Sequence, residues 1–184
     1  TGAFHEDGLT DMADGIGGGM TIERRLIIMK DSRIGTYGAS ALIMALLGKW
    51  VFLSELIEQT RTADLFMILV SSYAFSRAIA ASLIYDMPYV SDPDTSKSKP
   101  LANKQTRSET LFLIAIGLFP SLWFGIEFSI VLLAIGYVAR TLLKRWLTVR
   151  IGGFTGDCLG AAQQLVELSM YLLFIAAFYN GFIG

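Results

Sequence analysis

Residues 39–57 read ASALIMALLGKWVFLSELI, and residues 65–85 read LFMILVSSYAFSRAIAASLIY. Each run supplies roughly 20 mostly apolar residues, which is the length that a helix needs to cross the hydrocarbon core of a bilayer. Lipid offers backbone amides no hydrogen-bond partner, so a spanning segment must satisfy its own amides as a helix. We therefore predict a membrane-spanning helix in each run, the first interrupted by Lys49 and the second by Arg77.

Two further apolar segments follow. Residues 110–140 contain the helix breakers Pro120 and Gly125, so we predict a hairpin with two legs of about 15 residues. Each leg would rise only about 23 Å, so we expect the hairpin to be tilted or re-entrant. Residues 159–180 are expected to form the last helix, and the alternation typical of a β-barrel is absent from the sequence. The predicted fold is all-α, a polytopic integral membrane helical bundle in a single domain over residues 1–184.

The composition agrees with a protein that lies in lipid. Of the 184 residues, 53% are hydrophobic and 17% charged, whereas about a quarter of the residues of an average globular protein are charged. This deficit argues against a disordered chain and against nucleic-acid binding, and it favours membrane lipid as a partner. The single cysteine, Cys158, and the single histidine, His5, cannot form a disulfide or a zinc site of the usual spacing. Any metal ion must be bound by oxygen.

The basic residues indicate how the bundle is oriented. If residues 1–37 lie in the cytoplasm, the loops 86–109 and 140–158 share that side. Together these segments carry twelve basic residues: Arg24, Arg25, Lys30, Arg33, Lys97, Lys99, Lys104, Arg107, Arg140, Lys144, Arg145 and Arg150. Only Arg61 remains for the opposite side. By the positive-inside rule, we predict a protein of the cytoplasmic (inner) membrane whose motif loops and active site face the cytoplasm.

An acidic motif lies near the start of the chain. Asp7, Asp11 and Asp14 follow one another at spacings of four and three, which places them within about 60° of one helix face. Carboxylates this close repel one another unless a cation lies between them, and Mg²⁺ prefers such oxygen donors. The alternative is a solvated acidic helix end that is stabilised by the helix dipole. Because an apolar span and several glycines follow, we favour a metal site.

Residues 30–35, KDSRIG, precede the first predicted span. Lys30 and Arg33 carry the charge to clamp a phosphate, and arginine can do so with two hydrogen bonds. Cations beside a membrane also hold anionic lipid headgroups. The residue types alone leave both interpretations open.

Residues 150–161, RIGGFTGDCLGA, form a glycine-rich loop ahead of the last predicted helix. Backbone amides at a helix start attract phosphate, and Asp157 can add a carboxylate to a metal ion or take up a proton. The alternative is an ordinary loop in which Asp157 caps the helix. We expect Cys158 to be a small packing residue and His5 to be a local hydrogen-bonding partner.

Charged residues within the apolar segments are costly, at about 2.5–3.5 kcal/mol for an arginine on insertion scales. We therefore expect Arg77 to face the bundle interior and to pair with an acid or a ligand. The same expectation applies to Lys49 and Glu127.

Together these motifs resemble the cobalamin synthase family, also called adenosylcobinamide-GDP ribazoletransferases. The resemblance rests on residues 1–15 (TGAFHEDGLTDMADG), 29–36 (MKDSRIGT), 76–77 (SR), 152–157 (GGFTGD) and 159–161 (LGA). It implies a polytopic membrane enzyme that joins adenosylcobinamide-GDP to α-ribazole or α-ribazole 5′-phosphate and releases GMP, with Mg²⁺. This reaction is the last assembly step of the lower nucleotide loop of vitamin B12.

The resemblance also implies roles for the motif residues. The expected Mg²⁺ ligands are Asp7, Asp11 and Asp14, and the expected catalytic residues are Lys30, Arg33 and Asp157. The expected substrate-binding residues are His5, Ser32, Arg77, Gly152, Gly153, Thr155 and Gly156. The expected partners are the two substrates and membrane lipid, and the pattern leaves a homo-oligomer open.

The chain departs from the family pattern at several positions. Residues 89–91 read YVS where the family often has Tyr-Ala-Arg, so a cationic contact is lost or passes to Lys97 or Lys99. Ile27 stands where some members have a glutamate, and Glu6 where others have an apolar residue, so we give Glu6 less weight. Family members also carry an apolar segment before the first motif, which we expect the given chain to lack.

Two alternatives remain open at this point. Residues 11–15, DMADG, begin the acidic motif of CDP-alcohol phosphotransferases, but no Ala-Arg follows at the expected spacing. The second alternative is a transporter, with Lys49, Arg77 and Glu127 as its polar pathway. The gathering of the glycine and acid motifs on one predicted face disfavours it.

Overall fold

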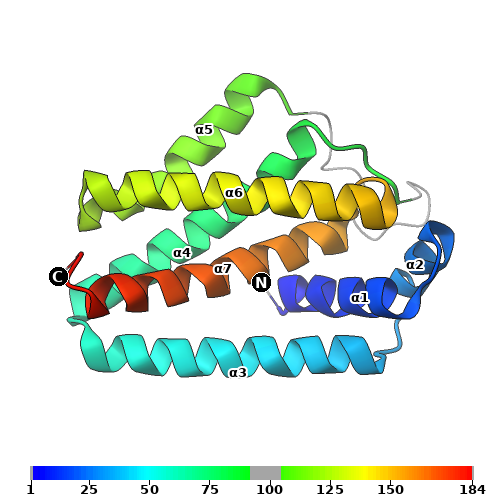
Figure 1. Cartoon of the computed structure of the whole chain (residues 1–184), viewed down its shortest axis with the longest axis horizontal. Coiled ribbons are helices and arrows are strands. Elements are labelled where there is room, and N and C mark those ends of the chain that lie inside the picture. The colour runs from blue at the N-terminus through cyan, green and yellow to red at the C-terminus, as the bar shows by residue number, and fades with distance from the viewer. Residues whose placement is uncertain (1, 92–104, 184) are drawn as a thin grey trace.

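A computed structural model describes residues 2–91 and 105–183, and Figure 1 shows how its helices are arranged. The elements are α1 (Phe4–Gly18), α2 (Ile22–Met29), α3 (Thr36–Gln59), α4 (Thr62–Ser82), η1 (Leu83–Tyr85), α5 (Arg107–Leu118), η2 (Phe119–Phe124), α6 (Ile126–Ile151) and α7 (Gly156–Tyr179). Among the described residues, strand-like pairing is limited to an isolated bridge between Tyr89 and Phe154. The predicted all-α bundle is confirmed.

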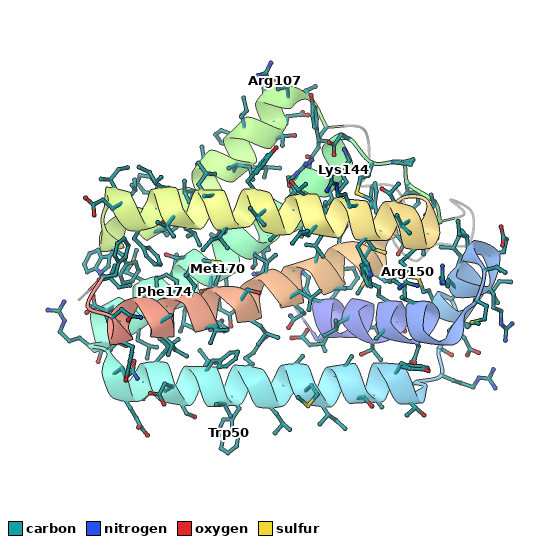
Figure 2. The ribbon with its side chains drawn as sticks, viewed as in Figure 1. Trp50, Arg107, Lys144, Arg150, Met170 and Phe174 are labelled. Atoms are coloured by element: carbon teal, nitrogen blue, oxygen red, sulfur yellow. The ribbon has the colours of Figure 1, made fainter. Side chains whose placement is uncertain are left out.

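Four helical segments are long and apolar enough to cross a membrane, namely α3, α4 continued by η1, α6 and α7. The helices predicted at 39–57, 65–85 and 159–180 are therefore confirmed, with small shifts of their boundaries. The outer surface of the bundle suits lipid. Trp50 on α3 is 68% exposed and points away from the other helices (Figure 2). In contrast, Phe174 on α7 is fully buried.

The predicted hairpin breaks where expected, but its legs are unequal. Pro120 lies in η2, and Gly125 adopts a φ of +97° just before α6 begins. α5 has 12 residues and α6 has 26, so the prediction of two legs of about 15 residues is wrong. α6 rises about 39 Å and continues through residues 140–151, which the sequence analysis assigns to a loop. The helix ends only at Gly152, whose φ of +78° is the left-handed conformation of a helix C-terminus.

The direction of the helices gathers the motif loops at one end of the bundle. α3 and α7 run opposite to α4 and α6 (Figure 1). Residues 30–35, 86–91 and 152–155 therefore lie at the same end, which we call the motif end. The amide of Val90 donates to the carbonyl of Phe154 at 3.0 Å and joins two of these loops.

The opposite end, which we call the distal end, contains the turn between α3 and α4 and the turn of the hairpin. Asp64 is buried there and accepts hydrogen bonds from Arg61 at 2.8 Å and from the indole of Trp123 at 2.9 Å. The motif-end half of α6 carries four of the twelve basic residues: Arg140, Lys144, Arg145 and Arg150. Lys97, Lys99 and Lys104 lie outside the described residues.

α1 is fixed against the start of α7 by close contacts between backbones. A Cβ atom added to Gly8 would lie 2.8 Å from the carbonyl oxygen of Asp157, and one on Gly160 would lie 3.2 Å from the carbonyl oxygen of His5. A side chain at Gly8 would force the two backbones apart, and one at Gly160 would be tightly packed against α1. Cys158 is fully buried in the hydrophobic cluster beside this contact, which confirms its predicted packing role.

Candidate active site

The contact between α1 and α7 brings the acidic motif to the glycine-rich loop. Gly8 contacts the backbone of Asp157, while Asp7 and Asp11 lie on either side of Gly8 along α1. Asp7 is exposed, and Asp11 and Asp157 are half-buried. Two motifs that lie about 150 residues apart in the sequence therefore meet, and the contact places three carboxylate-bearing residues in one region of the motif end.

Asp14 is engaged in a different way. Its carboxylate accepts hydrogen bonds from the backbone amides of Gly35 at 2.7 Å and of Gly38 at 2.8 Å. These amides belong to the start of α3, where helical amides lack partners in their own helix. Asp14 is only 7% exposed and thus caps α3 from a separate helix. Residue spacing gave no sign of this role, because the partners lie 21 and 24 residues further along the chain.

The described residues contain no group of three or more His, Cys, Asp or Glu side chains placed to hold a metal ion. The three aspartates therefore do not form a ready-made three-carboxylate site. Mg²⁺ needs only one or two protein carboxylates, because it retains water and shares phosphate oxygens with a substrate. Asp7 and Asp11, one turn apart on α1, meet that smaller requirement. Metal binding by Asp7, Asp11 and Asp14 stays a prediction.

The loop at residues 30–35 is stabilised by its own side chains and is open to solvent. The Arg33 guanidinium donates to both carboxylate oxygens of Asp31, with the shortest contact at 2.6 Å, and lowers the pKa of that carboxyl to about 2. The Arg33 side chain is 87% exposed, and Lys30 and Ser32 are also exposed. Because Gly35 is bonded to Asp14, this loop lies beside the second half of α1. Phosphate binding by the loop stays a prediction.

The glycine-rich loop has a structural role. Gly152 ends α6, and a Cβ atom on Gly153 would collide with the carbonyl oxygen of Pro88. The hydroxyl of Thr155 accepts from the amide of Cys158 at 3.4 Å and caps α7. The N-cap is therefore Thr155, and the alternative in which Asp157 caps the helix is wrong.

The remaining loop residues leave the other predicted roles untested. Gly156 is the first residue of α7. Tyr89 and Val90, where the family often has Tyr-Ala, pair with the loop through the bridge to Phe154. The proposed replacement of the missing arginine by Lys97 or Lys99 falls outside the described residues.

A polar cavity of about 210 Å³ lies further into the bundle, between α1, α3, α4 and α7. It is lined by His5, Glu6, Lys49, Tyr73, Arg77, Gln164 and Glu167. Burial and the nearby Arg77 guanidinium lower the pKa of His5 and so favour its neutral form at pH 7. The cavity brings together two predicted substrate-binding residues, His5 and Arg77, which are 72 positions apart in the sequence.

Lys49 is the centre of a buried network on one wall of this cavity. Its ammonium lies 3.0 Å from Glu167 and 3.6 Å from Glu6, and it donates to Gln164 at 3.2 Å. Glu167 is 1% exposed and also accepts from the hydroxyl of Tyr171 at 3.0 Å. The prediction that Lys49 faces the interior is confirmed.

The structure treats the predicted interior positions of Arg77 and Glu127 differently. Arg77 donates to the carbonyl of Tyr73 at 2.9 Å, and its guanidinium lies 5.2 Å from the centre of the Tyr73 ring. Within the described part of the chain, Arg77 has no carboxylate at ion-pair distance. Glu127 is exposed in the first turn of α6, so its predicted interior position is wrong. The helix begins at Ile126, and Glu127 consequently lies at the distal end.

Sequence reasoning missed several residues of the cavity. The sequence analysis gives Glu6 less weight and assigns no role to Gln164 and Glu167. A signal was present, since Gln163, Gln164 and Glu167 lie three or four positions apart on a spanning helix. Polar side chains on one face of such a helix need partners inside the bundle.

The fold and these sites define an integral membrane protein of the polytopic all-α class, with polar motifs gathered at one end and charged groups inside the bundle. The profile of the family described as cobalamin-5-phosphate synthase matches residues 1–175, and the chain belongs to this family. It is an enzyme, a transferase of cobalamin biosynthesis. This membership favours the predicted transferase over the phosphotransferase and transporter alternatives.

Curated relatives agree with the family match. A protein of Vibrio parahaemolyticus is 62% identical over 180 residues, which cover 98% of this chain and 67% of that protein. A protein of Vibrio vulnificus is 60% identical, with 96% and 68% covered, and one of Vibrio cholerae is 56% identical, with 96% and 66% covered. All three are named adenosylcobinamide-GDP ribazoletransferase. No solved structure matches the chain at a significant level.

Proposed function

We propose that this enzyme joins adenosylcobinamide-GDP to α-ribazole or α-ribazole 5′-phosphate and releases GMP, with Mg²⁺, at the cytoplasmic side of the inner membrane. The observation that carries the proposal is the contact of Gly8 with Asp157, because it unites the two most specific motifs of the family resemblance. The gathering of basic residues at the motif end supports the cytoplasmic orientation.

The reaction transfers a substituted phosphate group. A ribazole hydroxyl oxygen forms a bond to the phosphorus nearer cobinamide, the bond from that phosphorus to the bridging oxygen breaks, and GMP leaves with that oxygen. Asp7 and Asp11 would hold Mg²⁺, which when bound neutralises charge on the diphosphate. Asp157 either takes up the proton of the attacking hydroxyl or would add a third carboxylate to the ion, in which case the proton passes to water.

The exposed cations of residues 30–35 stabilise the leaving group in this proposal. Among the described residues the printed partner of the Arg33 guanidinium is Asp31 of its own loop, and the side chain is 87% exposed, so the guanidinium can turn to the phosphate of the departing GMP. Lys30 adds a second positive charge in the same loop. Charge that develops on the leaving oxygen is thereby offset in the transition state.

The test is incubation of the purified protein with adenosylcobinamide-GDP and α-ribazole, with and without Mg²⁺, while GMP release is followed. We expect release to require Mg²⁺ and to fall by at least about 100-fold in the Asp11→Asn variant, because one carboxylate ligand is lost. Glu23→Gln on α2, which removes one carboxylate away from the contact between α1 and α7, should keep normal turnover. Normal turnover of Asp11→Asn would remove the metal assignment, and absence of GMP release from the native protein would remove the proposed reaction.

A further inference from the structure

The polar cavity combines one unused hydrogen-bond acceptor with one unpaired cation. Glu6 Oε2 is shielded from solvent and has no hydrogen-bond partner among the described residues, while Glu6 Oε1 accepts from Gln164 at 3.2 Å. Arg77 uses Nη1 for the carbonyl of Tyr73 and has no carboxylate at ion-pair distance in residues 2–91 and 105–183. An unsatisfied buried polar atom costs free energy, and a ligand that donates to it recovers that cost.

The charge of the cavity favours a neutral ligand over an anion. Its lining carries two carboxylates, Glu6 and Glu167, and two cations, Lys49 and Arg77. Lys49 lies 3.0 Å from Glu167 and 3.6 Å from Glu6 Oε1, so among the described residues Glu6 Oε2 and the Arg77 guanidinium are the charged groups of this lining that have no partner of opposite charge. These four charges offset one another, so the lining has no net positive charge that would attract a phosphate. A group that both donates and accepts hydrogen bonds suits this pair.

The volume limits what can enter. At about 210 Å³ the cavity is smaller than the sites of roughly 300–1,000 Å³ that enclose whole drug-sized ligands. A sugar-sized part of a substrate fits this space, whereas a corrin macrocycle does not. Hydroxyl groups of a sugar donate to carboxylates and accept from guanidinium groups.

We propose that this cavity binds the ribose of the acceptor nucleoside, with Glu6 accepting a hydrogen bond from one ribose hydroxyl and Arg77 donating to a ribose oxygen. The inference rests on the proposed function and adds the group that the cavity recognises. Glu6 becomes a residue that determines acceptor specificity. Lys49 and Gln164 are positioning residues, because they hold the other oxygen of Glu6.

The experiment compares acceptors with the purified protein. Turnover of adenosylcobinamide-GDP is measured with α-ribazole, its 2′-deoxy and 5′-deoxy analogues, and α-ribazole 5′-phosphate, in the native protein, Glu6→Gln and Arg77→Lys. A site built to bond a hydroxyl discriminates against an analogue that lacks it. With the native protein, we expect at least one of the two deoxy analogues to react with a kcat/KM that is about tenfold or more below that of α-ribazole.

The decisive result is a loss of discrimination. Glu6→Gln should raise KM for α-ribazole about tenfold. For the deoxy analogue that the native protein uses poorly, the same substitution should change kcat/KM by less than about twofold. Glu58→Gln, at the exposed end of α3, should leave every acceptor unchanged. An equal loss for all acceptors, or an Arg77→Lys effect confined to the 5′-phosphate, overturns the inference. A native protein that turns over no acceptor refutes the proposed function instead, so the two failures are distinguishable.

Discussion

The bundle contains two clusters of three charged side chains in which the signs of the charges are reversed. In the interior, Lys49 lies between two carboxylates, Glu6 and Glu167. At the motif end, Asp86 lies between two cations, with Arg140 at 2.7 Å and Lys144 at 2.6 Å. The side chain of Glu167 is 1% exposed, whereas that of Asp86 is 31% exposed.

The difference teaches that burial, and not the shortness of a contact, decides how much each cluster contributes to the stability of the bundle. The motif-end contacts are shorter, yet solvent screens them, and such pairs contribute about 0–1 kcal/mol. Removing one partner of a buried pair leaves an uncompensated charge and costs about 3–5 kcal/mol. The stability of the bundle should therefore depend on Lys49 more than on Asp86. Substitutions in the two clusters test this order, and Asp14, which is buried but has uncharged partners, provides an intermediate case.

The largest expected effect is that of Lys49→Met. The substitution leaves Glu167 buried without its cation, so we expect a loss of about 3–5 kcal/mol in the free energy of unfolding. The measurement is unfolding of the purified protein in detergent by a chemical denaturant. Lys144→Met, the same substitution in the motif-end cluster, is the control and should cost less than about 1 kcal/mol. Equal losses in the two variants would contradict the comparison.

A double variant sharpens this prediction. In Lys49→Met combined with Glu167→Gln, the buried charge disappears together with its partner. The double variant should therefore be more stable than Lys49→Met alone, because the uncompensated carboxylate is gone. A double variant that is less stable by the full sum of the single effects would show that the two side chains do not interact.

Much of the fold could be predicted from the sequence, because apolar length and helix breakers act locally. The runs at 39–57 and 65–85 contain enough apolar residues to span a membrane whatever they pack against. The break at Gly125 likewise follows from one residue type. The length of α6 could not be predicted in this way, because Arg140 and Lys144 look like loop residues until they are seen paired with Asp86 on a continuing helix.

The candidate site was less predictable, because its residues depend on contacts between distant segments. Spacing grouped Asp7, Asp11 and Asp14 on one face, but it could not show that Asp14 meets the start of α3. The network around Glu6 likewise needs α1, α3 and α7 in contact, which no single segment encodes.

An intermediate effect is expected from Asp14→Ala. Asp14 is buried like Glu167, but its partners are two backbone amides and not a charged side chain. Loss of a helix N-cap costs about 0.5–2 kcal/mol, so the free energy of unfolding should fall by that amount. Asp14→Asn, which keeps one carbonyl oxygen as an acceptor, is the matched control and should lose less. The measurement is the denaturant midpoint in detergent, and equal midpoints for the native protein and Asp14→Ala would exclude the capping role.

The smallest effect is the pH dependence that Asp86 contributes. Partial burial raises the pKa of Asp86, but the hydrogen bonds and charges of Lys144 and Arg140 outweigh it, and the net pKa lies below the ordinary value. A carboxyl whose pKa is lower in the folded state stabilises the fold above its unfolded pKa of about 3.9. That stability is lost as the pH falls through the folded pKa.

We therefore expect Asp86→Asn to be less stable than the native protein by up to about 1 kcal/mol at pH 7, with the difference shrinking as the pH falls below 4. The measurement is denaturant unfolding at a series of pH values for both proteins, so that the titration of all other carboxyls cancels in the difference. Because the cluster is partly exposed, the difference at pH 7 should also decrease when the salt concentration is raised. A difference that stays constant from pH 7 to pH 3 would mean that Asp86 acts through packing alone, and the cluster would then no longer be an electrostatic counterpart of the one around Lys49.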